Sequence, residues 1–400
     1  MGIISSYYFL LCVFVIVHTS LGRRLFSLEV DPDFWKNVTE LISSKGYPVE
    51  NHVVVTQDGN ILQIQRIPYG RNGTRNEKKQ VVLIMHGLAG SAADFVMNFA
   101  DQSLGFILAD SGYDVWLGNN RGNTYSRRHV KYTRKMPELW NFSFDENAKY
   151  DIPAIIDYIL NETKQEQLYY IGHSQGNTAA FALLSENQEY NKKIKLLVAL
   201  APVAFVGHIN GPLWYIAQFI KPLEFLANLL GINEVLKSDG IMSYVSQYLC
   251  DTELRGACEF IIFIGTGFDL WQLNTTRLGV YSHHTPAGTS VKCYIHYGQL
   301  VKSRKFTKYD YGSKNELHYN QSTPPEYDVS KITTPVALMW GENDYLADPT
   351  DVSILRDKLK NVVSDYKVPY SWFSLLDFAI ALNVNEVVYN KVLQLLDQHK

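Results

Sequence analysis

The stretch Leu-Tyr-Tyr-Ile-Gly-His-Ser-Gln-Gly, residues 168–176, decides the fold that we expect for this chain. Its first four residues form a short apolar run that predicts a buried strand, and residues 177–184 predict a helix. A serine between two glycines at such a turn is typical of a nucleophile elbow, because only glycine leaves the backbone enough room beside the serine. The amino end of the following helix would stabilise developing negative charge there. Ser174 is therefore the candidate nucleophile.

A second strand supports this interpretation. Residues 81–85, Val-Val-Leu-Ile-Met, are apolar and uncharged, as in a central strand of a parallel sheet. They lead into His-Gly-Leu-Ala-Gly at residues 86–90, a loop of the kind that supplies one backbone N–H of an oxyanion hole. The second N–H comes from the residue after the nucleophile, so the expected donors are Leu88 and Gln175. The alternative is an ordinary strand followed by a glycine-rich turn.

Strands and helices alternate along much of the chain. A hairpin is expected around Asp58-Gly59, and a helix over residues 144–160, where Pro153 implies a kink or a late start. Apolar runs predict further strands at residues 114–117, 194–200 and 336–340. With the elbow, this alternation predicts an α/β-hydrolase fold, an α/β architecture whose mostly parallel sheet is flanked by helices.

The alternation stops between residues 205 and 327. Aromatic-rich helical segments fill this region, which predicts a mainly helical cap inserted over the carboxyl edge of the sheet. The hydrolase core would then comprise residues 23–204 and 328–400. Most of the aromatic side chains are expected in the packed interior of the cap, and a few would face Ser174.

The amino end predicts a targeting segment. Residues 3–17 are apolar except for Ser5 and Ser6, a run too short to span a bilayer comfortably, and Ser20 and Gly22 suit cleavage after residue 22. We therefore expect a signal peptide over residues 1–22 and no transmembrane segment in the mature chain; a membrane anchor is the alternative. Six N-x-[ST] sequons support export as a secreted or lysosomal glycoprotein: Asn37, Asn72, Asn141, Asn161, Asn274 and Asn320.

The four cysteines fit an oxidising compartment. Cys12 would leave with the signal peptide. Cys250 and Cys258 are close enough in the sequence to form one local disulfide, which leaves Cys293 free. The alternative is three free, buried thiols.

Composition and motifs exclude several classes of function. The net charge of −3 gives no electrostatic basis for binding nucleic acid. The sequence contains no phosphate-binding G-x-x-x-x-G-K-[ST], no H-E-x-x-H and no C-x-x-C, so neither a metal nor a cofactor is expected.

A carboxylate is expected on the turn after residues 336–340, because the catalytic acid of this fold follows the serine along the chain. Asp344 is the best candidate, since it lies nearest the strand end. Asp348 precedes Pro349, and Asp351 is expected to cap a helix over residues 352–359. A turn-capping role is the alternative for Asp344.

No histidine fits the third member of a catalytic triad. After Asp344 the chain has only His399, the second-last residue. His86 and His173 flank the candidate donor and nucleophile and are expected to be structural. The other candidates in the mature chain are His52, His129, His208, His283, His284, His296 and His318.

These motifs together resemble the acid lipase family, that of gastric and lysosomal acid lipases, from about residue 31 to the end. The resemblance implies an α/β-hydrolase core with a cap and hydrolysis of triacylglycerols or cholesteryl esters at a lipid–water interface. It assigns Ser174 as nucleophile, Asp344 as acid, and Leu88 and Gln175 as oxyanion donors. It rests on Gly-Tyr-Pro at 46–48, Arg-Ile-Pro-Tyr-Gly at 66–70, His-Gly-Leu at 86–88, Leu-Gly-Phe-Ile-Leu-Ala-Asp at 104–110, Arg-Gly-Asn-Thr at 121–124, Gly-His-Ser-Gln-Gly at 172–176, Pro-Ala-Gly-Thr-Ser at 286–290 and Asn-Asp-Tyr-Leu-Ala-Asp-Pro at 343–349.

One position departs from the family pattern. The family has Asn-His-Leu-Asp-Phe near the end, and that histidine is its base, whereas this chain has Ser-Leu-Leu-Asp-Phe at residues 374–378. The histidine position holds Leu375, or Phe373 when the match starts from Pro369 without gaps. Two hypotheses follow: an active lipase in which another histidine reaches Ser174, or a pseudolipase that binds a lipid or a protein in the inherited pocket. A structural or storage protein of this fold is a weaker third.

Overall fold

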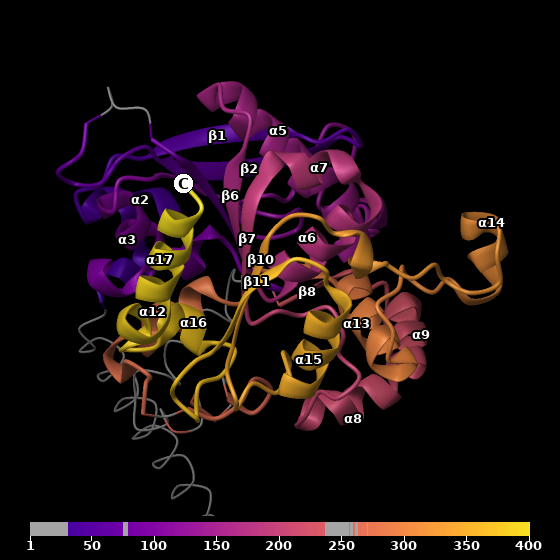
Figure 1. Ribbon diagram of the computed structural model, residues 1–400. Coiled ribbons are helices and arrows are strands. Elements are labelled where there is room, and N and C mark those ends of the chain that lie inside the picture. The colour runs from indigo at the N-terminus through magenta and orange to yellow at the C-terminus, as the bar shows by residue number, and fades with distance from the viewer. Residues whose placement is uncertain (1–30, 75–78, 237–255, 257–258, 261–262, 270) are drawn as a thin grey trace, which may run out of the picture.

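The computed structural model describes residues 31–74, 79–236, 256, 259–260, 263–269 and 271–400. A nine-stranded sheet forms its centre, with the order β1-β2-β4-β3-β6-β7-β10-β11 and with β5 paired to β2 (Figure 1). Strands β4 to β11 along this order are parallel, and β2 pairs antiparallel with β1, β4 and β5. The strands are β1 (Glu50–Val55), β2 (Asn60–Ile67), β3 (Val81–Met85), β4 (Asp114–Leu117), β5 (Arg128–His129), β6 (Leu168–His173), β7 (Ile194–Leu200), β10 (Val336–Trp340) and β11 (Val362–Lys367).

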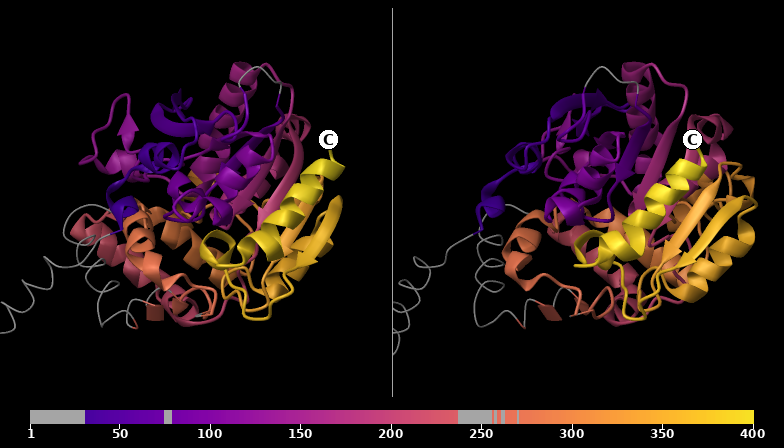
Figure 2. Two further views of the ribbon diagram at one scale, coloured as in Figure 1. Left: turned by 90° about the vertical axis from the view of Figure 1, so that its left-hand side faces the viewer. Right: turned by 60° about the vertical axis from the view of Figure 1, so that its left-hand side comes forward.

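Helices cover the sheet. Those of the predicted core are α2 (Val38–Ser44), α3 (Leu104–Asp110), α4 (Phe144–Glu146), α5 (Ile152–Thr163), α6 (Gln175–Glu186), α7 (Gln188–Lys193), α15 (Pro349–Lys358), α16 (Asp377–Ile380) and α17 (Asn390–Gln398). The C-terminal helix α17, yellow in Figure 2, returns to the sheet. The Tyr169 hydroxyl of β6 is 2.9 Å from the His399 carbonyl and 3.2 Å from the Leu396 carbonyl, so it shares its one proton between them. The predicted α/β-hydrolase architecture, with its mostly parallel sheet, is confirmed.

The described part of residues 205–327 adds no strand to this sheet. Their helices α8, α9 and α13 gather at the right of Figure 1, and α12 lies at the left. The elements of this region are α8 (Pro212–Gln218), α9 (Ile220–Leu230), α12 (Leu278–His284), α13 (Val291–Ser303), α14 (Asn315–Tyr319) and the two short strands β8 (Glu234–Val235) and β9 (Thr289–Ser290), which pair with each other. Among the described residues, no helix has both the length and the apolar character needed to cross a bilayer.

Short irregular helices join these elements. The 3₁₀ turns are Pro32–Trp35, Ala92–Phe95, Ala100–Gln102, Pro137–Trp140, Thr275–Arg277, Gly312–Lys314 and Val329–Lys331, and the π-helical turns are Asn147–Asp151 and Asn385–Tyr389. The first π-turn divides the helix predicted over residues 144–160. Helical residues nevertheless run without a break from Phe144 to Thr163, so the helix does not start late, and the alternative of a local irregularity before Pro153 is what the π-turn shows.

The prediction that Asp351 caps the helix after the Asp344 turn is wrong. Helix α15 begins earlier, at Pro349, and its N-cap is Asp348, whose Oδ1 accepts a hydrogen bond from the Thr350 amide at 2.8 Å. Proline suits this first helical position because its fixed φ already matches the helix. Asp351 instead accepts hydrogen bonds from the amide and Nδ1 of His208, both at 2.8 Å.

Candidate active site

Ser174 occupies a tight turn between β6 and α6. Its φ of 51° and ψ of −114° lie in a region that non-glycine residues rarely adopt, as expected for a nucleophile elbow. The two flanking glycines are required by space. A Cβ at Gly176 would lie 2.5 Å from the carbonyl oxygen of Met85, and one at Gly172 would lie 2.9 Å from the amide nitrogen of Asn177. The local sequence therefore holds the serine where the motif predicts it.

The two predicted oxyanion donors lie next to Ser174. Gln175 is the first residue of α6, so its N–H is one of those that a helix leaves without an intrahelical acceptor. The loop after β3 packs directly on the nucleophile, because a Cβ at Gly87 would lie 3.2 Å from the Cβ of Ser174. Leu88, the next residue, lines the same cavity as Ser174.

His86 holds this loop in place. Its Nε2 accepts hydrogen bonds from the Asn120 amide at 3.1 Å and the Asn123 side chain at 3.2 Å, so the ring proton lies on Nδ1 and is donated to the Gly87 carbonyl at 2.8 Å. Burial lowers the pKa of His86 to about 4. A neutral imidazole with both nitrogens occupied has a structural role and is not available as a base.

Asp344 lies on the turn after β10 with one oxygen held and the other free. Oδ1 accepts hydrogen bonds from the amides of Leu346 at 2.9 Å and Ala347 at 2.8 Å. Oδ2 is buried and has no hydrogen-bond partner within the described part of the chain. Burial raises the pKa of this carboxyl group to about 7. The Asp344 side chain is thus held in place through Oδ1, as a triad acid would be, while Oδ2 meets no hydrogen-bond donor among the described residues.

The loop of residues 373–375 lies between the elbow and the acid turn. His173 Nε2 donates a hydrogen bond to the Leu375 carbonyl at 2.9 Å, which ties Leu375 to the residue before the nucleophile. The Phe373 carbonyl accepts from the Asn343 amide at 3.2 Å, next to Asp344. Leu375 is 7% exposed and packs in the main hydrophobic core. Both positions at which the family resemblance can place the base, Phe373 and Leu375, thus carry a hydrocarbon side chain in the main core.

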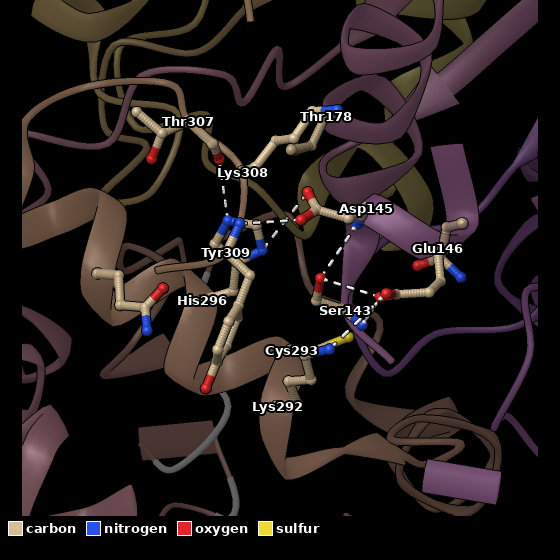
Figure 3. Close-up of polar contacts among 12 residues, drawn as sticks. Ser143, Asp145, Glu146, Thr178, Lys292, Cys293, His296, Thr307, Lys308 and Tyr309 are labelled. Atoms are coloured by element: carbon tan, nitrogen blue, oxygen red, sulfur yellow. Dashed lines mark hydrogen bonds and ion pairs between the residues drawn. The ribbon is translucent and has the colours of Figure 1, made fainter. Parts of the chain in front are cut away.

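No histidine among the described residues hydrogen-bonds to the Ser174 hydroxyl. His173 is bound to Leu375 through Nε2, its Nδ1 has no partner there, and burial lowers its pKa to about 4. His296 belongs to α13, and its Nε2 donates to the Thr307 carbonyl at 2.9 Å (Figure 3). The remaining rings contact other groups: His52 the Tyr158 hydroxyl, His129 the Asp58 carbonyl, His208 the Asp351 carboxylate, His283 the Phe34 ring, His284 the Asp33 carbonyl, His318 the Tyr311 ring and His399 the Leu395 carbonyl.

An apolar cavity of about 140 Å³ borders Ser174. The predicted core contributes Leu88, Val203 and Leu346 to its wall, and residues 205–327 contribute the rest: Val206, Ile209, Leu213, Ile216, Ala217, Ile220, Tyr294, Tyr297, Gly298 and Val301. Ser174 is 8% exposed. Hydrocarbon is the ligand chemistry that such a wall favours, because it offers few hydrogen-bonding groups. Within the described ranges, no three His, Cys, Asp or Glu residues are grouped as metal ligands.

The residues predicted for modification are only partly described. Cys250 and Cys258 lie outside the described residues, as does the predicted signal peptide. Cys293 is buried and free, and burial raises the pKa of its thiol to about 11. Of the six sequon asparagines, Asn274 is half-buried and the others are exposed: Asn37, Asn72, Asn141, Asn161 and Asn320.

Comparison with known proteins identifies the family. Residues 80–370 match the model of the α/β hydrolase fold, and residues 38–99 match the partial α/β-hydrolase lipase region. Gastric triacylglycerol lipase of Rattus norvegicus is 44% identical over 370 residues, which cover 92% of this chain and 93% of the relative. The chain belongs to the acid lipase family. A second acid lipase, the lysosomal acid lipase/cholesteryl ester hydrolase of Homo sapiens, is 43% identical over 375 residues, 93% of each chain.

Solved structures support the fold of this acid lipase family member. A candidate lipase from Sulfolobus solfataricus matches with a TM-score of 0.55 at 15% identity, covering 88% of this chain and 99% of its own. Another candidate lipase, from Acinetobacter baumannii, matches with a TM-score of 0.52 at 13% identity, covering 94% of this chain and 100% of its own. At such identities the likeness concerns the fold alone.

Proposed function

We propose that this chain is an acid lipase-type carboxylic-ester hydrolase that acts on neutral lipid esters, triacylglycerols or cholesteryl esters, in lipid breakdown at a lipid–water interface. Its turnover is lowered by the missing histidine. The observation that carries the proposal is the apolar cavity that Ser174 and Leu88 border together. The names of the related gastric and lysosomal lipases support the substrate class.

In the proposed reaction, the Ser174 hydroxyl attacks the ester carbonyl, the ester C–O bond breaks, and the alcohol leaves with the proton that Ser174 gives up through water. A second water molecule then hydrolyses the acyl-enzyme to the free acid and restores Ser174. The amides of Leu88 and Gln175 stabilise the oxyanion, a contribution of about 2.7–4 kcal/mol for one such donor in a well-studied protease. Among the described residues, no imidazole is placed to accept the proton of Ser174. For the same reason, no imidazole donates a proton to the leaving alcohol. In a serine protease, loss of the catalytic histidine lowers turnover about 10⁶-fold. The remaining site still accelerates the reaction about 10³–10⁴-fold over the uncatalysed rate in water.

A second candidate function is a pseudolipase that binds a lipid or a protein without turnover. The specific observation in its favour is that the free oxygen of Asp344 faces no donor among the described residues, while the two candidate base positions, Leu375 and Phe373, both carry hydrocarbon side chains. Retention of both Ser174 and Asp344 favours the hydrolase. Turnover and binding, measured together, separate the two.

With a short-chain ester such as a p-nitrophenyl ester, the natural chain is expected to turn over well below the usual enzyme range of about 1–10³ per second. The residual rate should fall to background in Ser174→Ala, whereas a non-hydrolysable ether analogue of a triacylglycerol should bind both proteins equally. Rate and binding are measured on the same preparations. Turnover within the usual range that is abolished in Ser174→Ala would show that another group acts as base, and no binding of the ether would contradict the substrate class.

We further propose that the chain enters the secretory pathway and is secreted or lysosomal, with residues 1–22 as signal peptide, a disulfide between Cys250 and Cys258, and residues 205–327 as a cap over Ser174. The sequons support this route, since five of the six asparagines are exposed. The cap is supported by the ten residues that this region contributes to the wall of the Ser174 cavity.

Expression in secretory cells is expected to yield a protein whose gel mobility increases on treatment with an N-glycosidase. A variant with all six sequon asparagines changed to glutamine serves as the control and should not shift. A cytosolic protein without a mobility change would contradict the proposed route.

A further inference from the structure

Helix α13 separates two cavities. Tyr294, Gly298 and Val301, spaced three and four residues apart on one face of the helix, line the apolar cavity that contains Ser174. Val291, Ile295 and Gln299, each four residues after the one before, lie on the neighbouring face and line a separate groove of about 680 Å³. Figure 1 shows α9 beside α13, and α9 adds Lys221, Glu224 and Asn228 to the groove.

The two cavities differ in chemistry. The Ser174 cavity has an almost wholly aliphatic and aromatic wall, whereas the groove carries charged groups. In the groove, the Lys292 ammonium meets the Tyr311 hydroxyl at 3.1 Å, and the Tyr309 hydroxyl donates to Glu224 at 2.7 Å (Lys292 and Tyr309 are labelled in Figure 3). A partition between these cavities therefore keeps hydrated groups away from a hydrocarbon chain.

Ile220, the first residue of α9, completes this partition. It lines the Ser174 cavity, and it also packs against Ile295 and Tyr309, which line the groove. Its side chain fills a notch that only glycine can leave in α13, because a Cβ at Gly298 would lie 2.5 Å from Cγ1 of Ile220 and 2.7 Å from its Cδ1. Ile220 is 6% exposed, so the contact is closed to solvent.

We propose that Ile220, seated against Gly298, forms the closed end of the hydrocarbon pocket and limits the length of the ester chain that binds beside Ser174. This inference rests on the proposed function, because it names a specificity determinant of the same site. The pocket of about 140 Å³ has room for on the order of five to ten water-sized groups, counted by their share of liquid volume or by one probe sphere each. Carbons beyond that number would have to leave through the mouth of the pocket, where their burial contributes less.

The test uses fatty acids as unreactive chains, so it requires no turnover. Binding of decanoate and hexadecanoate, below their micellar concentrations, is measured calorimetrically for the natural chain and for Ile220→Ala. In the natural chain, hexadecanoate is expected to bind no more than about threefold tighter than decanoate. In Ile220→Ala, the affinity for hexadecanoate is expected to rise at least about 10-fold, which is the effect of burying about two further methylenes. The affinity for decanoate is expected to change by less than about threefold.

Val206→Ala is the matched control, because Val206 lines the Ser174 cavity but not the groove. It enlarges the pocket without removing the partition, and it should leave the ratio of the two affinities unchanged. Ile220→Val, a smaller truncation, should raise the affinity for hexadecanoate by about threefold. It replaces Ile220→Ala if thermal unfolding shows that the alanine variant is misfolded. Equal ratios in the natural chain and the Ile220 variants would overturn the inference alone. Failure of the natural chain to bind either acid would overturn the proposed function and the inference with it.

Discussion

Replacing Leu375 by histidine is expected to raise ester turnover about 10²–10⁴-fold, because the site keeps the proposed nucleophile Ser174 and the proposed acid Asp344 and lacks only the base. The backbone at this position is tied to the elbow by the hydrogen bond from His173 to the Leu375 carbonyl. The Oδ2 atom of Asp344 is buried and has no partner among the described residues, so it can accept a hydrogen bond from the ring N–H. The new ring would replace a leucine of similar volume, so little repacking is required.

The gain should fall short of the roughly 10⁶-fold that a complete triad supplies. By the family resemblance, Ser374 is expected to stand where the family has asparagine, and the loop from Pro369 is expected to be two residues longer. An imidazole displaced by about 1 Å can lose about 100-fold. Ser374 and Asp377 also form a fixed pair, in which the amide and hydroxyl of Ser374 donate to Oδ2 of Asp377 at 2.6 and 3.0 Å. This pair restricts how far the loop can adjust.

The pH dependence gives a second readout. A histidine base must be neutral, so the rate of Leu375→His should rise with pH through the pKa of the new imidazole. Leu376→His, one residue further on, is the matched control and should remain at the rate of the natural chain. Asp344→Asn in the Leu375→His background should lower the rate again. If Leu375→His hydrolyses the ester no faster than Leu376→His, the missing base is not what limits the natural chain.

Much of the fold could be predicted because the central strands are buried on both faces and therefore appear as continuous apolar runs. Strand β3 is entirely buried over residues 81–85, as its sequence indicates. Strand β11 was not predicted. It lies at the edge of the sheet, its residues are alternately half-buried and exposed, and Asp365 and Lys367 interrupt its apolar character. Edge strands of this kind lack the apolar run on which the prediction of the others depended.

The site could be predicted only where a short motif fixes the backbone. The elbow and the oxyanion loop could be predicted because they contain glycines at positions where a Cβ would collide with neighbouring atoms. The contacts that join distant segments could not be predicted, since they depend on the topology: His86 with Asn120, and His173 with the carbonyl of Leu375. The wall of the Ser174 cavity could not be predicted either, because its residues come from positions as far apart as Leu88 and Leu346, and no local sequence pattern links them.

Replacing Arg121 by alanine is expected to destabilise the fold by about 3–5 kcal/mol, the usual result when one partner of a buried ion pair is removed. Arg121 follows β4 and lies in the segment whose Asn120 and Asn123 hold His86. Its guanidinium approaches Asp151 at 2.7 Å and Asp58 at 2.6 Å, and its amide donates to Asp151 at 3.0 Å. The Asp151 side chain is fully buried, so without Arg121 its charge would stay in the interior without a cation.

Arg356→Ala is the matched control for the loss of an arginine from an ion pair. Arg356 contacts Asp357 at 2.9 Å and Asp365 at 3.2 Å, but its side chain is 39% exposed, and a pair of this kind contributes about 0–1 kcal/mol. The free energy of unfolding is measured from urea transitions. The double variant Arg121→Ala/Asp151→Ala should be more stable than Arg121→Ala alone, because it removes the buried charge together with its partner. Equal losses in Arg121→Ala and Arg356→Ala would show that burial of the Asp151 charge does not set the stability of this loop. The oxyanion loop would then depend on the hydrogen bonds of His86 without support from the ion pair behind it.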